Sequence, residues 1–206
     1  MTAGAATERC VGVILAGGRA SRFGGSPKGL GVVGGHRVID RVAGALRGAC
    51  DDLLLIANDP SASTWLPGVA VHADLRPGHG AMGGLHAALH HAGTSVLVVA
   101  WDMPWVPGAL LQRLRSLGTG ADAALPWSPG PRGIEPLCAW YAHACLPAVT
   151  RRLDAGEREM VGLYSDVRTR ILPEADVRAF GDPAHLFLNI NTPEELARAD
   201  AQAGTS

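Results

Sequence analysis

Residues 11–28 read VGVILAGGRASRFGGSPK, an apolar run that leads directly into a glycine-rich loop with basic residues. The run Val11 to Leu15 predicts a buried strand, and Ala16-Gly17-Gly18 follows it at once. Arg22 and Lys28 lie further along the same loop. Glycine lets backbone N–H groups approach a polyphosphate closely, while arginine and lysine neutralise its charge. The stretch therefore favours a nucleotide-phosphate site at the end of a strand.

Two other structures could carry these loop residues: a P-loop and an ordinary surface loop. A P-loop requires Gly-Lys-Ser/Thr, whereas Lys28 follows Pro27 and precedes Gly29, so that pattern fails. A flexible surface loop that carries basic residues by chance is also compatible with the spacing, although the spacing favours the phosphate site. The residues of the loop by themselves leave the second reading open.

Outward from this loop, short β-branched runs alternate with longer segments of helical period, which is typical of βαβ units around a parallel sheet. We expect a single Rossmann-like three-layer α/β/α domain over residues 1–206, with a mainly parallel sheet. Its nucleotide-binding part would span about residues 11–125 and its acceptor-side part about residues 126–203. The expected strands are Val11 to Leu15, Leu53 to Ala57, Val69 to Ala73, Val96 to Ala100, Ala121 to Leu125, Leu137 to Ala142, Thr169 to Leu172 and Leu186 to Ile190. The expected helices are Val38 to Cys50, Gly84 to His91, Gly108 to Leu117, Cys145 to Ala155, Glu157 to Ser165 and a last one opened by a capping box at Thr192-Pro-Glu-Glu195.

The composition excludes several classes of protein. Eighteen Lys and Arg residues against nineteen Asp and Glu give a net charge of −1, which argues against binding to nucleic acid or to a membrane surface. No apolar run approaches the roughly 18 residues that a membrane span needs, and the first ten residues lack a secretory signal. We therefore expect a cytoplasmic protein.

Glycine is the unusual component of the sequence. There are 27 glycines, and 13 of them lie in residues 12–35 and 78–84. Since 47% of the residues are hydrophobic, disorder does not explain them. Each cluster follows an expected strand and precedes an expected helix, which places both at the rim where an open α/β sheet binds ligands.

The second glycine cluster matches the sequence pattern of a dinucleotide-binding loop. Gly78-His-Gly80-Ala-Met-Gly83 satisfies GxGxxG, and Asp102 follows at a suitable distance for a dinucleotide ribose. In a dinucleotide fold, however, the first glycine sits at the strand end, whereas residues 75–77 intervene here. An NAD-dependent oxidoreductase remains an alternative on this motif.

Asp102 follows the most hydrophobic strand of the sequence. Val96 to Ala100 is expected to be buried on both faces, which places Asp102 at the carboxyl end of the strand and thus at the ligand rim. A carboxylate there suits Mg²⁺, which is typically held by one or two carboxylates together with substrate phosphates. On spacing alone, a role as a simple cap of the next segment is equally compatible.

The first loop resembles a known family. Leu15, Ala16, Gly17, Arg22, Gly25 and Lys28 are similar in order and spacing to the signature loop of the molybdenum-cofactor guanylyltransferase type of nucleotidyltransferase, the MobA proteins. Three further segments are similar to family motifs: Gly80-Ala-Met-Gly83-Gly84, Trp101-Asp102-Met-Pro-Trp105 and Phe187-Leu-Asn189-Ile-Asn191-Thr-Pro-Glu-Glu-Leu196. Two positions depart from the family pattern, because Ala81 replaces a common proline and Trp101 a residue that is usually small or Cys.

The resemblance implies roles for individual residues. It implies catalysis by Lys28, Arg22 and Asp102, with Mg²⁺ held by Asp102 and Asn191. Asn191 or Thr192 could instead cap the last helix. The residues implied to contact the guanine nucleotide are Leu15, Ala16, Gly17, Gly18, Lys28, Asn58, Asp74, Gly80, Gly83 and Asp102.

The expected function is transfer of GMP from Mg-GTP to molybdenum-molybdopterin, with release of pyrophosphate. The alternatives are a molybdopterin cytidylyltransferase, a guanylyltransferase for another phosphorylated acceptor, an NAD-dependent oxidoreductase and a non-catalytic nucleotide-binding protein. The expected partners are GTP and molybdopterin, with transient contacts to molybdenum cofactor delivery proteins. Monomer and weak homo-oligomer are both compatible with the sequence.

Overall fold

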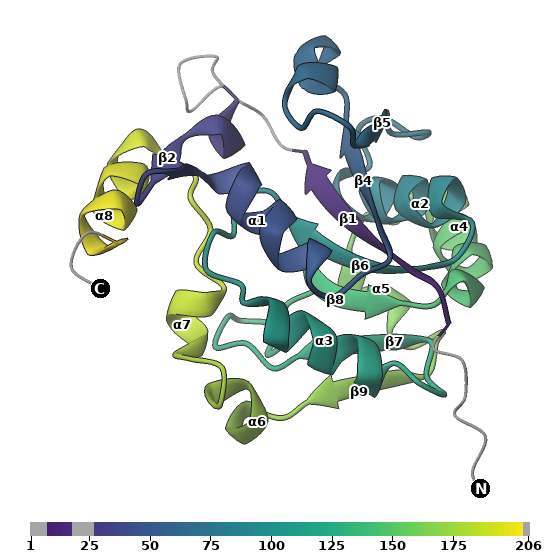
Figure 1. Ribbon diagram of the computed structural model, residues 1–206. Coiled ribbons are helices and arrows are strands. Elements are labelled where there is room, and N and C mark those ends of the chain that lie inside the picture. Colours follow the sequence, from purple (N-terminus) through teal and green to yellow (C-terminus); the bar gives the residue numbers. More distant parts are fainter. Residues whose placement is uncertain (1–7, 18–26, 204–206) are drawn as a thin grey trace, which may run out of the picture.

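The computed structural model describes residues 8–17 and 27–203, which form one seven-stranded sheet with helices on both faces (Figure 1). The strand order is β5-β4-β1-β6-β8-β7-β9. The strands are β1 (Cys10–Ala16), β4 (Asp52–Ala57), β5 (Ala70–His72), β6 (Ser95–Ala100), β7 (Ala123–Pro126), β8 (Cys138–Tyr141) and β9 (Thr169–Leu172). A small antiparallel hairpin of β2 (Val32–Val33) and β3 (His36–Arg37) forms a second sheet.

Helices cover the two faces of the large sheet in separate groups. On one face α1 (Val38–Arg47) and α3 (Gly108–Leu117) pack against the strands, together with the short helices α6 (Glu174–Arg178) and α7 (Pro183–Leu186). On the other face lie α2 (Gly80–Ala92), α4 (Leu146–Asp154) and α5 (Met160–Leu163). The last helix, α8 (Pro193–Ala203), packs beside β2 at the edge of the molecule (Figure 1). Residues 8–17 and 27–203 also contain three 3₁₀ turns: η2 (Lys28–Leu30), η3 (Pro60–Thr64) and η4 (His143–Cys145).

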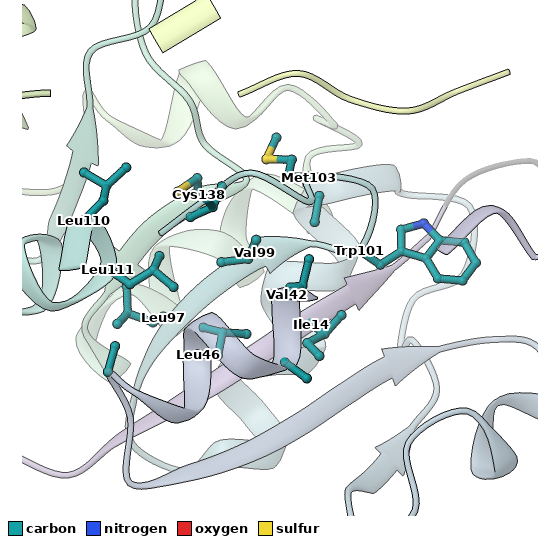
Figure 2. Packing of buried hydrophobic residues seen from close by; sticks show 14 of the residues in the cluster. Ile14, Val42, Leu46, Leu97, Val99, Trp101, Met103, Leu110, Leu111 and Cys138 are labelled. Atoms are coloured by element: carbon teal, nitrogen blue, oxygen red, sulfur yellow. The ribbon is translucent and has the colours of Figure 1, made fainter. Parts of the chain in front are cut away.

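The central strands are buried on both faces, which explains their continuous apolar sequences. Along β1, Ile14 enters the core beneath α1 and α3, while Val13 and Leu15 enter the core beneath α2. Along β6, Leu97 and Val99 join the first core, as Figure 2 shows, while Val96 and Val98 join the second. The period of two along each strand thus places successive side chains in different cores.

The order of the strands determines where a ligand can bind. β1 pairs in parallel with β4 on one side and with β6 on the other, while the chain runs from β1 through β4 and β5 before it returns to β6. The direction of winding therefore reverses between β1 and β6. In open α/β sheets such a reversal opens a crevice beyond the carboxyl ends of the strands. Here those ends carry Gly17 and Asp102.

Seven of the eight expected strands are confirmed, and the sheet is mainly parallel as predicted. Its antiparallel pairs are β6 with β8 and β8 with β7, because β8 enters the sheet from a loop instead of a crossover helix. Four expected helices are confirmed with small shifts in their ends, and α2 begins at Gly80, one turn before the predicted Gly84. The hairpin of β2 and β3 and helix α6 were not predicted.

The expected strand Leu186 to Ile190 is wrong. The chain forms α7 up to Leu186, and residues 187–191 have no strand pairing. Asp182 caps this helix by accepting a hydrogen bond from the Ala184 N–H at 3.2 Å, and Pro183 occupies its first position, so local signals favour a helix start. Leu186, Phe187 and Ile190 of this stretch are still buried, but outside the sheet, whereas Leu188 is exposed.

The expected helix Glu157 to Ser165 is also wrong in its extent. Only Met160–Leu163 is helical, and Gly156, with a φ of +79°, ends the preceding helix in the left-handed region. In the described parts of the chain, no helix is both long and apolar enough to pass through a membrane.

Candidate active site

A cavity of about 610 Å³ lies at the carboxyl rim of the sheet. The ends of β1, β4 and β6 form its floor, and the start of α2 forms one wall. Its lining includes most of the sequence-predicted nucleotide residues within the described parts of the chain, namely Leu15, Ala16, Gly17, Lys28, Asn58, Asp74, Gly80 and Asp102. The predicted residues Gly18 and Arg22 lie outside the described residues.

At the end of β1, Gly17 contributes only backbone atoms to the cavity and leaves open space beside them. A Cβ atom added at Gly17 would have no heavy atom within 4 Å, although Gly17 lines the cavity. The Leu15 carbonyl accepts a hydrogen bond from the Trp101 N–H at 3.2 Å, which ties the end of β1 to the segment after β6. The space beside Gly17 is therefore available to a ligand and is bounded by fixed backbone.

Lys28 and Asp102 form an ion pair at the centre of the rim. The Lys28 Nζ also donates a hydrogen bond to Asn191 Oδ1 at 2.9 Å. The Lys28 and Asp102 side chains are only 15% and 9% exposed, so the pair is largely withdrawn from solvent. Lys28 is the only lysine in the sequence, since the other 17 of its 18 basic residues are arginines. Three segments far apart in the chain thus converge on one ammonium group.

Asn58 and Asp74 form a second polar pair in the cavity. The Asn58 Nδ2 donates to Asp74 Oδ2, and the Asp74 N–H donates to Asn58 Oδ1, both at 2.8 Å. Asn58 follows β4 and Asp74 follows β5, so the two hydrogen bonds join the ends of neighbouring strands. This pairing fixes the orientation of both side chains at the open side of the cavity.

The start of α2 is built by glycines with positive φ. Gly78 has a φ of +84° and Gly80 a φ of +57°, values that favour glycine over any other residue. The first N–H groups of a helix have no acceptor within it, and the helix dipole favours negative charge there. Gly80 and Ala81 bring this end of α2 to the cavity. The arrangement provides an electropositive wall for an anionic ligand.

Gly83 has a different place from the one that the resemblance implied. It is buried in α2 and is absent from the cavity lining. A Cβ there would lie 3.1 Å from the Arg76 carbonyl oxygen, so Gly83 allows the preceding turn to pack closely on the helix. Its neighbour Gly84 does line the cavity and packs against Leu15.

The segment before α8 contributes to the site and caps the helix with different residues. Glu195 accepts hydrogen bonds from the N–H groups of Asn191 at 2.6 Å and Thr192 at 3.1 Å, and its own N–H donates to Thr192 Oγ1 at 3.2 Å. This is the predicted capping box, with Thr192 as the cap. The Asn191 side chain is therefore free of a capping role and contacts Lys28, while Asn189 lines the cavity.

The site residues expected from the sequence do not include Trp101, which the resemblance gave only as a departure from the family pattern. Trp101 lines the cavity and is only 5% exposed. Glu135 does not line the cavity, although its neighbour Leu137 does. Burial raises the pKa of the Glu135 carboxyl and the Asp102 charge raises it further, whereas the Leu137 N–H, which donates to Oε1 at 3.0 Å, opposes the rise.

The donor atoms at the rim suit a hard cation. Asp102 Oδ2 and Asn191 Oδ1 already converge on the positive charge of the Lys28 ammonium. Carboxylate and amide oxygens are also what Mg²⁺ accepts, usually with most of its remaining ligands from water and phosphate. Among the described residues, no three His, Cys, Asp or Glu side chains are grouped as a metal site. The residues therefore fit a magnesium ion that shares its coordination with a bound phosphate.

Comparison with known proteins shows which family the chain resembles. A model of the MobA-like NTP transferase domain matches residues 12–169. The molybdenum cofactor guanylyltransferase of Desulfosudis oleivorans is 36% identical over 197 residues, which are 94% of this chain and 96% of that protein. A probable molybdenum cofactor guanylyltransferase of Deinococcus radiodurans is 37% identical over 195 residues, with 94% and 95% covered.

Solved structures give the same result. The crystal structure of molybdopterin-guanine dinucleotide biosynthesis protein A from Archaeoglobus fulgidus superposes with a TM-score of 0.78 at 27% identity, covering 95% of this chain and all of that one. The predicted nucleotidyltransferase fold and enzyme class are thereby confirmed. The chain belongs to the MobA-like NTP transferase family.

Proposed function

We propose that this protein is a molybdenum cofactor guanylyltransferase, which transfers GMP from GTP to the terminal phosphate of molybdenum-loaded molybdopterin. The observation that carries the proposal is the convergence of Lys28, Asp102 and Asn191 at the rim of a cavity whose far wall is the start of α2. The names of the relatives support the choice of substrates.

The reaction exchanges one phosphorus–oxygen bond for another. An oxygen of the acceptor phosphate forms a bond to the α-phosphorus of GTP, and the bond from that phosphorus to the α,β-bridging oxygen breaks. The electron pair leaves with pyrophosphate. Since an acceptor phosphate is already ionised at neutral pH, this step needs no general base. The task of the protein is to hold the reactants in line and to oppose the negative charge that grows on the phosphate oxygens.

The described residues divide this task between them. Lys28 supplies a positive charge that would otherwise be paired only with Asp102, and the backbone at Gly17 and the start of α2 supply N–H groups for phosphate oxygens. Asn58 and Asp74, joined by two hydrogen bonds, provide fixed polar groups for the nucleoside. Asn189, at the side of the cavity nearest α8, is a suitable contact for the acceptor.

Asp102 and Asn191 are the residues that would hold Mg²⁺ in this site. When bound, the ion would neutralise phosphate oxygens and so favour departure of pyrophosphate. With the ion on Asp102, the Lys28 ammonium would be available to phosphate oxygens of the substrate, because its present partner would be engaged by the metal.

Pyrophosphate release tests the proposal. The purified protein is incubated with Mg²⁺, molybdenum-molybdopterin and each of the four nucleoside triphosphates in turn. We expect release with GTP only, and a guanine dinucleotide product detectable by mass spectrometry. Release with CTP but not GTP would make the protein a cytidylyltransferase, and release with no nucleotide would overturn a catalytic function.

A further inference from the structure

We propose that Trp101 is a positioning residue for Lys28, because its indole ring is the surface on which the turn that carries Lys28 rests. The inference rests on the proposed function, since it concerns the charge that Lys28 brings to the site. Figure 2 shows the indole at one end of the buried cluster, away from Leu97 and Leu111. It therefore extends the rigid core as far as the cavity.

The contact between Gly29 and Trp101 leaves no space for a methyl group. A Cβ atom added at Gly29 would lie 2.4 Å from Cε3 and 2.8 Å from Cδ2 of the indole. Gly29 has no positive φ, so its backbone conformation would accept alanine. The residue is glycine because the backbone next to Lys28 lies directly on the ring.

The ring itself is held in place from several directions. It stacks on Trp65, with centroids 5.2 Å apart and planes 19° from parallel. The Trp65 Nε1 donates to Ser61 Oγ at 3.1 Å, and Arg37 donates to the Trp65 carbonyl oxygen at 3.0 Å. Because the Trp101 backbone is also bonded to β1, the ring cannot move away from Gly29 without disturbing all of these contacts.

The position of Trp101 in the chain links the two charged groups. Trp101 supports the turn of η2, and the next residue, Asp102, receives the Lys28 ammonium. One short segment thus sets the position of the cation and of its partner. The indole Nε1 is buried and has no hydrogen-bond partner among the described residues. The packing of the ring, not its N–H group, is therefore the contribution that we assign to Trp101.

The single lysine of this chain allows a direct measurement. Acylation by a small amine-reactive ester, followed by peptide mass analysis, reports the accessibility of Lys28 separately from that of the α-amino group. In the wild-type protein labelling of Lys28 should be slow, since its side chain is 15% exposed and ion-paired. Displacement of the turn by Gly29→Ala, or loss of its support in Trp101→Leu, should increase the labelling rate several-fold.

A double-mutant comparison separates this contact from general destabilisation. In the wild-type background Gly29→Ala should lower kcat by roughly 10- to 100-fold, because misplacing a reacting group by about 1 Å can cost about 100-fold. In the Trp101→Leu background the added methyl group has space, so Gly29→Ala should change kcat and labelling by less than about 2-fold. Gly44→Ala is the matched control, since Gly44 lies in α1 with no atom within 4 Å of an added Cβ.

The conservative variant gives a further check. Trp101→Phe keeps an aromatic ring against Gly29 and should keep kcat within about 3-fold of the wild type, while Trp101→Leu should lower kcat by about 10-fold with a smaller change in KM. An equal effect of Gly29→Ala in both backgrounds would overturn the inference, as would unchanged labelling in Trp101→Leu. Labelling needs no substrate, so a protein that lacks guanylyltransferase activity would refute the proposed function while labelling still decides the role of Trp101.

Discussion

Lys28 and Asp102 are 74 positions apart in the sequence, and their side chains form an ion pair at the rim of the sheet. The pair is largely buried, which distinguishes it from the exposed ion pairs elsewhere on the protein, such as Arg9 with Asp52. Exposed pairs contribute little to stability, whereas each member of a buried pair depends on the other to offset its lost hydration. Variants at these two positions should therefore affect stability and activity in different ways.

Asp102→Asn should reduce turnover by about 10²- to 10³-fold, the usual effect of losing one preorganised electrostatic group. The amide retains the shape of the side chain and a hydrogen-bond acceptor for Lys28, so the fold should persist. Turnover is measured by pyrophosphate release over a range of Mg²⁺ concentrations, and the apparent affinity for Mg²⁺ should also fall. Activity within a few-fold of wild type would remove Asp102 from the metal site.

Lys28→Met should be inactive and less stable than the wild type. It leaves the Asp102 carboxylate buried without a partner, which we expect to cost about 1–3 kcal/mol of the free energy of unfolding, because the cavity still admits water. The double variant Lys28→Met/Asp102→Asn removes the unpaired charge and should recover most of that stability but none of the activity. Urea denaturation measures the stability, with Arg47→Ala on the exposed surface of α1 as the control.

If Lys28→Met instead unfolds at the same urea concentration as the wild type, the ion pair contributes nothing to the fold. Lys28 would then be held in place by the packing of η2 alone.

Asn58→Ala should weaken GTP binding by roughly 5- to 10-fold, as expected for one lost neutral hydrogen bond of about 1 kcal/mol. Since Asn58 and Asp74 orient each other through two hydrogen bonds, Asp74→Ala should have a similar effect, and the double variant should bind only slightly more weakly than either single one. Titration calorimetry with GTP and Mg²⁺ measures these affinities. Unchanged affinity in both single variants would exclude the pair from the nucleotide site.

The central strands could be predicted from the sequence because burial on both faces gives them continuous apolar runs. β6 is apolar at every position after Ser95, since it is buried on both faces, and a carboxylate directly beyond such a strand must lie at the rim. The same reasoning places Gly17 and Asp102 together through the parallel pairing of β1 with β6. Topology, more than any single motif, made the centre of the site predictable.

The contacts within the site were less accessible to sequence reasoning. Nothing in the spacing of Gly29, Trp65 and Trp101 indicates that their side chains and backbone meet, because each contact depends on how a loop turns after its strand. The strand expected at Leu186 to Ile190 failed for a related reason. Most of its apolar residues are buried, as the pattern indicates, but Leu188 is exposed, and burial outside a sheet and burial within it give the same pattern over so short a run.

The histidines of α2 predict how stability depends on pH. His86 is 8% exposed and its Nδ1 has no hydrogen-bond partner among the described residues. Burial lowers the pKa of His86 below its ordinary value of 6.5, the charges of Arg76 and His90 lower it further, and Asp154 opposes them. The unfolded chain therefore takes up this proton at a higher pH than the folded protein. The stability that the neutral His86 provides is complete above about pH 6.5 and is lost as the pH falls from there towards the lower pKa of the folded state.

His86→Leu should accordingly make the loss of stability between about pH 6.5 and pH 5 less steep than in the wild type. Carboxyl groups with lowered pKa values, such as Asp122, also lose stabilising interactions in acid, but they do so at lower pH and in both proteins alike. The difference between the pH dependence of stability in His86→Leu and that in the wild type therefore reports the contribution of His86. Exposed His36→Asn serves as the control, and its pH profile should match that of the wild type. Parallel profiles for His86→Leu and the wild type would mean that His86 is protonated equally in the folded and unfolded states.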